Sequence, residues 1–340
     1  MKTRIYTKGD YLARIISSLQ RAQPGDRVLL ATMDFDVNYK IYDQLLDALT
    51  RAAQRSVDVA FVVDAYTFLN SIILTSKARA KRQRNLRWIK ALEAAGVHVT
   101  ICNQPKLPIT IPFMGRSHIK CFIINDVVYL GGCNFNNPLA LDSMLEFQSK
   151  EAADWICAQF KMIAQTGSTQ KAFNGQDLAC VLPFGGKIII DAGKRGQSTI
   201  LDTAYQLIDT AKTNVTMTCQ FFPGESTAHH LTQALLHKCH IMLYYSHPAA
   251  HGGSAFVQTI YNQLQRLRFP KQLLSGRLKR QAPVLHAKML CSEQSAMIGS
   301  HNYVWQGVKF GTTEIAFVTQ SPEIIKQIEN SIHELVAPYR

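Results

Sequence analysis

The chain has 340 residues, of which 47% are hydrophobic and 18% charged, which is enough for a large packed core in one large or two ordinary domains. No apolar run approaches about 18 residues, so we expect no transmembrane helix, and the first residues lack the apolar core of a secretory signal. The formal net charge of +13 favours a polyanionic partner, nucleic acid or an anionic membrane surface, over the alternative of a merely basic soluble protein.

Helices and strands alternate from the start of the chain. Residues 12–36 predict an amphipathic helix, a turn and an apolar strand, and residues 42–64 predict another helix and strand. The later part has the same order, with a helix and a strand predicted in 200–223 and again in 228–248. This alternation predicts a layered α/β architecture in both parts.

An internal repeat relates the two parts at an offset of 168 residues. The coinciding pairs are His118 and His286, Lys120 and Lys288, Gly131 and Gly299, Asn134 and Asn302, and Glu146 and Glu314. With frequencies of roughly 5% each, five such identities have a chance of order 10⁻⁷ before the choice of offset is allowed for. We therefore predict two homologous halves, 1–165 and 185–340, joined by a polar linker at 166–184.

The repeated histidines and lysines predict an anion site. Residues i and i+2 of a strand point to one face, so His118 and Lys120 project together, as do His286 and Lys288. Burying a lysine beside a histidine is costly unless an anion lies between them. Two such pairs facing each other across a pseudo-twofold axis would form a cationic pocket.

The other repeated polar residues complete this site. Asn134 and Asn302 stand on glycine turns that let the backbone come close, and they would add amide donors. Glu146 and Glu314 could accept the other imidazole N–H and fix its tautomer. Such a pocket suits a phosphodiester: one histidine attacks phosphorus, and the other protonates the leaving oxygen and activates the incoming water or alcohol. The lysines and asparagines would hold the non-bridging oxygens, and the scheme needs neither a metal nor a cofactor.

The doubled motif H-x-K-x4-(acid)-x5-G-[GS]-x-N resembles that of the phospholipase D superfamily across essentially the whole chain. This resemblance implies a pseudo-dimer of two α/β/α sandwich halves, with one active site at their interface and a phosphohistidine intermediate. It implies His118 as the nucleophile and His286 as the acid/base. The family aspartate is replaced by Asn125, which Asp126 follows, and by Glu293; because the family treats this position as structural, we expect activity to survive.

The surroundings of the motif favour lipid over nucleic acid. An apolar loop just before His118 ("KLPITIPFMGR", 106–116) suits acyl chains, although buried packing is an equal alternative. Residues 68–87 join an apolar stretch to clustered cations, as in a segment lying on an anionic bilayer, although such a cluster also fits a phosphate backbone. A second basic stretch, 266–280, carries six cations and could equally be a solvated face.

The function predicted first is a phospholipase D-type phosphodiesterase or phosphatidyltransferase acting on phospholipids and resembling cardiolipin synthases. Its partners would be an anionic phospholipid and a membrane surface, and a monomer would suffice for a complete site. The alternatives are a metal-independent nuclease of the same superfamily and a catalytically silent protein that binds anionic membranes or nucleic acid. Hydrolysis and transfer are not distinguished by the sequence.

The remaining histidines and the cysteines bear on metals and on localisation. Six histidines fall within 229–251, but neither HExxH nor a paired Cys/His spacing is present, so we predict scattered surface histidines rather than a zinc site. His301, beside Asn302, is a candidate for lining the site. The cysteines have no CxxC pair, and those in apolar runs, such as Cys121 and Cys219, predict buried free thiols. We therefore expect a reduced, cytoplasmic protein. The predicted lipid function adds the expectation that it binds peripherally to membranes.

Overall fold

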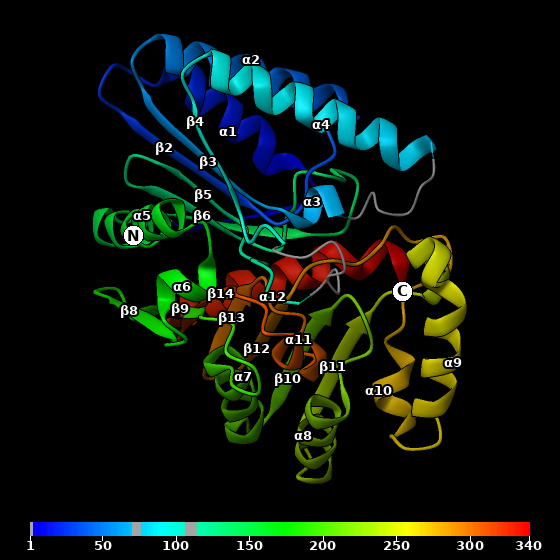
Figure 1. Cartoon of the computed structure of the whole chain (residues 1–340). Coiled ribbons are helices and arrows are strands. Elements are labelled where there is room, and N and C mark those ends of the chain that lie inside the picture. The colour runs from blue at the N-terminus through cyan, green and yellow to red at the C-terminus, as the bar shows by residue number, and fades with distance from the viewer. Residues whose placement is uncertain (1–2, 70–75, 106–113) are drawn as a thin grey trace.

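Each half of the chain folds around a seven-stranded mixed sheet (Figure 1). The computed structural model describes residues 3–69, 76–105 and 114–340. The first half contains β1 (Thr3–Thr7), α1 (Asp10–Arg21), β2 (Arg27–Thr32), α2 (Lys40–Gln54), β3 (Asp58–Asp64), α3 (Tyr66–Leu69), α4 (Ser76–Ala94), β4 (His98–Cys102), β5 (Cys121–Ile124), β6 (Val127–Gly131), β7 (Ser143–Gln148) and α5 (Lys150–Thr166).

The second half repeats this plan with different additions. Its elements are α6 (Thr169–Phe173), β8 (Leu178–Leu182), β9 (Gly186–Asp191), α7 (Thr199–Thr210), β10 (Asn214–Cys219), α8 (Glu225–Leu236), β11 (His240–Tyr245), η1 (Pro248–Ser254), α9 (Ala255–Gln265), α10 (Lys271–Ser275), β12 (Met289–Ser292), β13 (Ala296–Gly299), α11 (Trp305–Phe310), β14 (Glu314–Thr319), α12 (Pro322–Val336) and η2 (Ala337–Tyr339).

The two sheets share an order of strands. The first sheet runs β1-β7-β6-β5-β2-β3-β4. Starting from the edge strand β8, the second sheet runs β8-β9-β14-β13-β12-β10-β11. β2 therefore corresponds to β10, β5 to β12, β6 to β13 and β7 to β14, with β4 and β8 added at opposite edges. This topology confirms the expected pair of homologous α/β halves related by a pseudo-twofold axis.

The sequence pattern explains the layers. β2 is parallel to β3 and β10 to β11, and these strands are almost entirely buried, as expected for strands covered on both faces. One core lies outside the first sheet under α1, α2 and α4, and another lies outside the second sheet under α7 and α8. The largest core lies between the sheets and includes α5 and α12 (Figure 1).

Most of the predicted elements are confirmed, with two local differences. His118 and Lys120 precede β5, and His286 and Lys288 precede β12, so each pair lies in an extended segment at the entrance of a strand. The stretch 166–184, expected to be a linker, instead contains α6 and β8, and β8 pairs with β9 at the edge of the second sheet.

The cysteines and the helices of the described residues bear on the predicted free thiols and on membrane-spanning segments. All eight cysteines are free, and Cys121 and Cys219 are buried. Within the described ranges, none of the helices combines the length and the apolarity that crossing a bilayer requires.

Candidate active site

Short contacts between the halves place each motif histidine against the opposite half. Ser117 forms a parallel bridge with Thr313, and the N–H of His118 donates to the Thr313 carbonyl at 2.7 Å. Leu285 bridges Leu141 in the same way, and the N–H of His286 donates to the Leu141 carbonyl at 2.8 Å. In each bridge the partner from the opposite half is followed directly by a carboxylate: Glu314 follows Thr313, and Asp142 follows Leu141. The backbone therefore determines where each imidazole contacts its acid.

Each imidazole is paired with a buried carboxylate. His118 Nδ1 lies 2.8 Å from Glu314 Oε2, and His286 Nδ1 lies 2.6 Å from Asp142 Oδ2. A carboxylate accepts only, so Nδ1 carries the proton in each pair and Nε2 is left with its lone pair. This is the tautomer that a nucleophilic or general-base histidine requires.

The expectation that Glu146 orients an imidazole is wrong. Its carboxylate accepts from the Tyr6 hydroxyl at 2.9 Å and pairs with Arg14 at 3.4 Å, and Asp142 takes the expected place. The cause is a difference in loop length. Gly131 pairs with Met144, 13 residues later, whereas Gly299 pairs with Ala316, 17 residues later.

The four extra residues in the β13–β14 connection accommodate the short helix α11. In the register of the sheets, Glu314 therefore corresponds to Asp142 and not to Glu146. Because the repeat was compared without gaps, the acid of the first half was missed.

The glycine turn next to Asp142 leaves no room for a side chain. A Cβ on Gly131 would lie 2.2 Å from the Ser143 carbonyl oxygen, and one on Gly132 would lie 2.3 Å from Asp142 Oδ1. In the second half Ser300 stands at the position of Gly132, and its hydroxyl donates to Glu314. The turns therefore bring the backbone against the acids that hold the histidines.

The two motif lysines lie beneath the histidines. Lys120 and Lys288 are fully buried, and each ammonium donates to the carbonyl of its own histidine. Among the residues that the structure describes, each ammonium has this one hydrogen-bond acceptor, so two of its three N–H donors remain for an anion. Burial lowers the pKa of Lys288 to about 8 and holds that of Lys120 well below its usual value.

Burial also determines the charge of the imidazoles. It lowers the pKa of both His118 and His286 to about 4; the lysines act in the same direction and the paired carboxylates oppose them. Burial alone would raise the pKa of the carboxyls, but the facing histidines reverse this and hold the pKa of Asp142 and Glu314 below their usual values. At neutral pH the site therefore combines neutral imidazoles with ionised acids.

Both histidines line a cavity of about 390 Å³, together with Asn134, Asn302 and His301. Thr32 donates to Asn134 Oδ1 at 3.4 Å, which leaves the amide N–H₂ of Asn134 as a donor. Asn302 Oδ1 is buried and has no partner among the described residues, so this oxygen is an unused acceptor at the cavity. His301 Nδ1 accepts from the Tyr303 N–H at 2.9 Å, which places its proton on Nε2.

We call this cavity the apolar branch because one of its walls is apolar. Its side chains include Met33, Tyr66, Phe221, Val304 and Phe310. The second-half loop that carries α11 supplies Val304 and Phe310, so the extra residues of that loop help to form the apolar wall.

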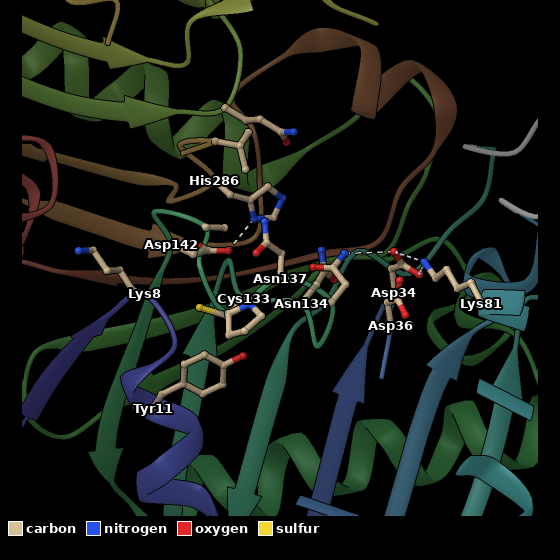
Figure 2. A pocket seen from close by; sticks show the side chains of 15 residues that line it. Lys8, Tyr11, Asp34, Asp36, Lys81, Cys133, Asn134, Asn137, Asp142 and His286 are labelled. Atoms are coloured by element: carbon tan, nitrogen blue, oxygen red, sulfur yellow. Dashed lines mark hydrogen bonds and ion pairs between the residues drawn. The ribbon is translucent and has the colours of Figure 1, made fainter. Parts of the chain in front are cut away.

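A second cavity, of about 350 Å³, adjoins the first at His286 and Asn134, and we call it the polar branch. It is lined by Lys8, Asp34, Asp36, Lys81 and Asn137, among others. Figure 2 shows Asp142 directed at His286 and Asp34 directed at Lys81, with Asn134 and Asn137 between them. The Lys81 ammonium lies 2.9 Å from Asp34 Oδ1. The site is therefore asymmetric, although its histidines are arranged symmetrically.

Residues outside the repeated motif, which the sequence pattern did not predict, complete this arrangement. Asp34 follows β2 and accepts from Thr67, Lys81 and Asn136. Asp64 is fully buried and accepts from the N–H of Tyr66 and of Ser117, which fixes the segment just before His118. Polar residues at the ends of apolar strands were a signal that could have identified both.

Asn125 and Glu293, which replace the family aspartate, hold equivalent turns. Asn125 Oδ1 accepts from the Arg27 N–H at 3.0 Å, at the start of β2. The Glu293 carboxylate accepts from the backbone N–H of Lys212 at 2.7 Å, just before β10. Both side chains tie a β-hairpin turn to a neighbouring strand, which agrees with a structural role.

The structure describes only part of the two segments expected at the rim, the apolar loop 106–116 and the basic segment 68–87. Most of the apolar loop lies outside the described residues, as do residues 70–75 of the basic segment. In α4, Lys81 pairs with Asp34 and Arg84 pairs with Asp36, so two cations of the predicted membrane-binding cluster are used inside the protein.

The histidine-rich segment 229–251 shows no arrangement for a metal. His230 stacks on Tyr205 and pairs with Asp209, and His251 stacks on Phe221. Across the described ranges, no cluster of three or more His, Cys, Asp or Glu side chains could hold a metal ion.

Comparison with known proteins places this geometry in context. The family model described as "Cardiolipin synthase, PLD-like domain" matches residues 15–164 and 205–336. A crystal structure of phosphatidylserine synthase from Haemophilus influenzae Rd KW20 superimposes with a TM-score of 0.76 at 13% identity, covering 99% of this chain and 87% of that one. Polyphosphate kinase from Porphyromonas gingivalis superimposes with a TM-score of 0.60 at 15% identity, covering 98% of this chain and 50% of that one. No curated protein matches the sequence.

Proposed function

The chain belongs to the cardiolipin synthase family of phospholipase D-like domains, and from this membership and the site geometry we propose that it is a phosphatidyltransferase acting on phospholipids. Its reaction passes through a phosphohistidine, and its substrates are anionic phospholipid at a membrane surface and an alcohol. As a phospholipase D-superfamily enzyme it makes and breaks phosphodiester bonds, which agrees with the paired imidazoles.

In the first step, His118 Nε2 attacks phosphorus while the bond from phosphorus to the headgroup oxygen breaks. His286, protonated once the anionic substrate is bound, donates its proton to that oxygen, and the headgroup leaves as an alcohol. In the second step, the acceptor alcohol gives its proton to His286 as its oxygen attacks phosphorus. The N–P bond then breaks and His118 is restored.

The remaining side chains stabilise charge during these steps. Lys120, Lys288 and the asparagine amides hold the non-bridging oxygens. Glu314 and Asp142 keep their imidazoles in the required tautomer and stabilise positive charge on them, so they are positioning residues.

The observation that supports a lipid substrate is the pair of unlike branches meeting at His286. A phospholipid carries an apolar diacylglycerol on one side of phosphorus and a polar alcohol on the other. The apolar branch fits the first and the polar branch fits the second. A nucleic acid has sugars and bases on both sides, and its groove would carry cations and stacking aromatics along its whole length.

The same asymmetry supports the assignment of the two histidines. His286 lines both branches, whereas His118 lines the apolar one. The group beside the polar branch is the one that must protonate the departing headgroup and activate the entering alcohol. His286 is therefore the acid/base, and His118 is the nucleophile.

The test is incubation of the purified protein, in EDTA, with radiolabelled phosphatidylglycerol vesicles and separately with labelled single-stranded DNA. After an alkaline denaturing quench, lipid-derived label that acid releases from the protein supports the proposal, provided that His118→Ala abolishes it. Cleavage of DNA with inert lipid would replace the proposal with a nuclease. Silence toward both would favour a binding protein without catalysis.

A further inference from the structure

The helix α9 exposes its apolar side chains to solvent. Phe256 is 75% exposed and Leu264 is 53% exposed, and Leu267, in the turn after the helix, is 87% exposed. The spacing of four residues from Phe256 to Ile260 and from Ile260 to Leu264 places these side chains along one face. Val257 widens the same stripe. Figure 1 shows α9 at the outer edge of the second half.

The opposite face of α9 is polar and lies against the protein. Asn262 and Gln265 are the buried residues of this helix, and their side-chain oxygens have no hydrogen-bond partner in the part of the chain that the structure describes. A surface helix of a protein that stays in water has the reverse pattern, with apolar residues inside and polar residues outside. The outward apolar stripe is therefore suited to a partner, because exposed apolar side chains in one contiguous patch are characteristic of interaction sites.

The charge of α9 and of the residues that follow it indicates the chemistry of that partner. Residues 255–280 contain no acidic residue. The cations of this stretch are Arg266, Arg268, Lys271, Arg277, Lys279 and Arg280. Arg268 pairs with Glu225 at 3.2 Å, and both side chains are exposed. Among the described residues, Arg268 is the one cation of this stretch that forms an ion pair. An apolar helix face followed by mostly unpaired cations is the pattern of a helix that lies in the interface of an anionic bilayer.

The inner face of α9 and the preceding η1 contact the wall of the apolar branch. The Tyr261 hydroxyl of α9 donates to the Pro223 carbonyl at 3.4 Å. The ring of His251, in η1, stacks on Phe221 with ring centres 4.9 Å apart, and Phe221 lines the apolar branch. The helix that carries the stripe is thus connected, through its inner face and η1, to the segment that forms one wall of the active site.

We infer that α9 and the turn after it are the surface by which the protein docks on an anionic lipid bilayer. The apolar stripe enters the acyl boundary, and the cations that follow meet the lipid phosphates. Docking itself needs no catalysis. The added inference that it delivers phospholipid to the apolar branch rests on the proposed function.

The experiment compares the full chain with two triple variants. Phe256→Ser, Leu264→Ser and Leu267→Ser together remove the stripe. The control variant, with Met162→Ser, Val181→Ser and Leu236→Ser, removes three exposed apolar side chains from other elements. Binding is measured by co-sedimentation with vesicles of pure phosphatidylcholine or of phosphatidylcholine containing phosphatidylglycerol. Circular dichroism confirms that each variant is folded, and light scattering gives its oligomeric state.

The wild-type protein and the control variant are expected to bind the anionic vesicles, with weaker binding at high salt. The stripe variant is expected to bind at least about tenfold more weakly. Equal binding of the stripe and control variants would overturn the inference, as would failure of the wild-type protein to bind. So would a wild-type dimer that the stripe substitutions convert to a monomer without change in vesicle binding, because the stripe would then be covered by a second copy.

A water-soluble, short-chain phosphatidyl substrate separates this inference from the proposed function. If both hold, the stripe variant retains wild-type turnover on the soluble substrate and loses turnover on vesicles. If the protein binds anionic vesicles through α9 but converts neither substrate, the docking surface stands and the proposed function fails.

Discussion

Glu314 Oε2 lies 2.8 Å from His118 Nδ1, and the two residues belong to opposite halves of the chain. The pair formed by Asp142 and His286, at 2.6 Å, has the reciprocal arrangement. Each half therefore contributes one motif imidazole and the carboxylate that orients the imidazole of the other half. The site is complete only when the halves are in contact, which explains why both motifs stand at the interface between the sheets.

The first prediction separates Asp142 from Glu146. Asp142→Asn leaves the shape of the site intact but favours the wrong tautomer of His286, so turnover should fall by roughly 10³–10⁴-fold, as for a triad that loses its acid. Glu146→Gln keeps an acceptor for Tyr6 and should stay within about threefold of wild type. Steady-state transfer rates decide this, with near-ultraviolet circular dichroism to confirm that both variants are folded. A larger loss for Glu146→Gln would reverse the assignment.

The second prediction distinguishes nucleophile from acid/base with a substrate that needs no acid. A phosphatidyl ester of p-nitrophenol has a leaving group that departs without protonation. His286→Asn should therefore release about one equivalent of nitrophenol rapidly and then stop, because the acceptor alcohol is no longer activated. His118→Asn should show no burst. Stopped-flow absorbance with mass spectrometry of the labelled peptide measures both, and a burst in the His118 variant would exchange the two roles.

The sequence predicted the fold and most of the site because the two halves repeat. Identities separated by the same offset selected the histidines, lysines and asparagines without any information on contacts. The acid of the first half was missed because the β6–β7 connection is shorter than its counterpart, so an ungapped comparison shifted Glu314 from Asp142 onto Glu146. Identities at one fixed offset do not show that a loop has a different length in the two halves.

Burial and exposure were harder to predict than the motif. Clustered cations in α4 indicated a solvent-facing or membrane-facing surface, yet Lys81 and Arg84 neutralise Asp34 and Asp36 after β2. These ion pairs depend on contacts between segments far apart in the chain. Conversely, the helical spacing of apolar residues in α9 predicts a face that packs on a core, whereas this face points outward.

The third prediction concerns the apolar branch. Val304 immediately precedes α11, and aspartate is favoured at such a position, so Val304→Asp should fold while placing a carboxylate in the apolar branch. Exclusion of acyl chains should raise KM for long-chain phosphatidyl substrates by about tenfold or more. Turnover of a small soluble phosphodiester should change by less than about threefold, because the histidines are untouched. Equal effects on both substrates would show that acyl chains do not enter this branch.

The fourth prediction follows from the lowered pKa of the buried imidazoles, about 4 for His118 and for His286. A bound phosphodiester anion favours the protonated imidazole and raises its pKa, so the complex holds more protons than the free protein. Affinity should therefore rise as pH falls from neutrality toward about 4, by up to about tenfold per pH unit for one proton taken up. Above pH 8 affinity should fall further as Lys288 loses its charge, since burial lowers its pKa to about 8.

Titration calorimetry with a hydrolysis-resistant phosphonate monoester, in two buffers of different ionisation enthalpy, measures both the affinity and the protons taken up. His286→Asn should reduce the uptake below neutral pH if this imidazole receives the proton. Lys288→Arg, whose guanidinium keeps its charge, should reduce the alkaline loss. An affinity that is independent of pH between 5 and 9 would mean that neither imidazole nor Lys288 changes its charge when the anion binds. That result would contradict the assignment of His286 as the group that is protonated in the complex.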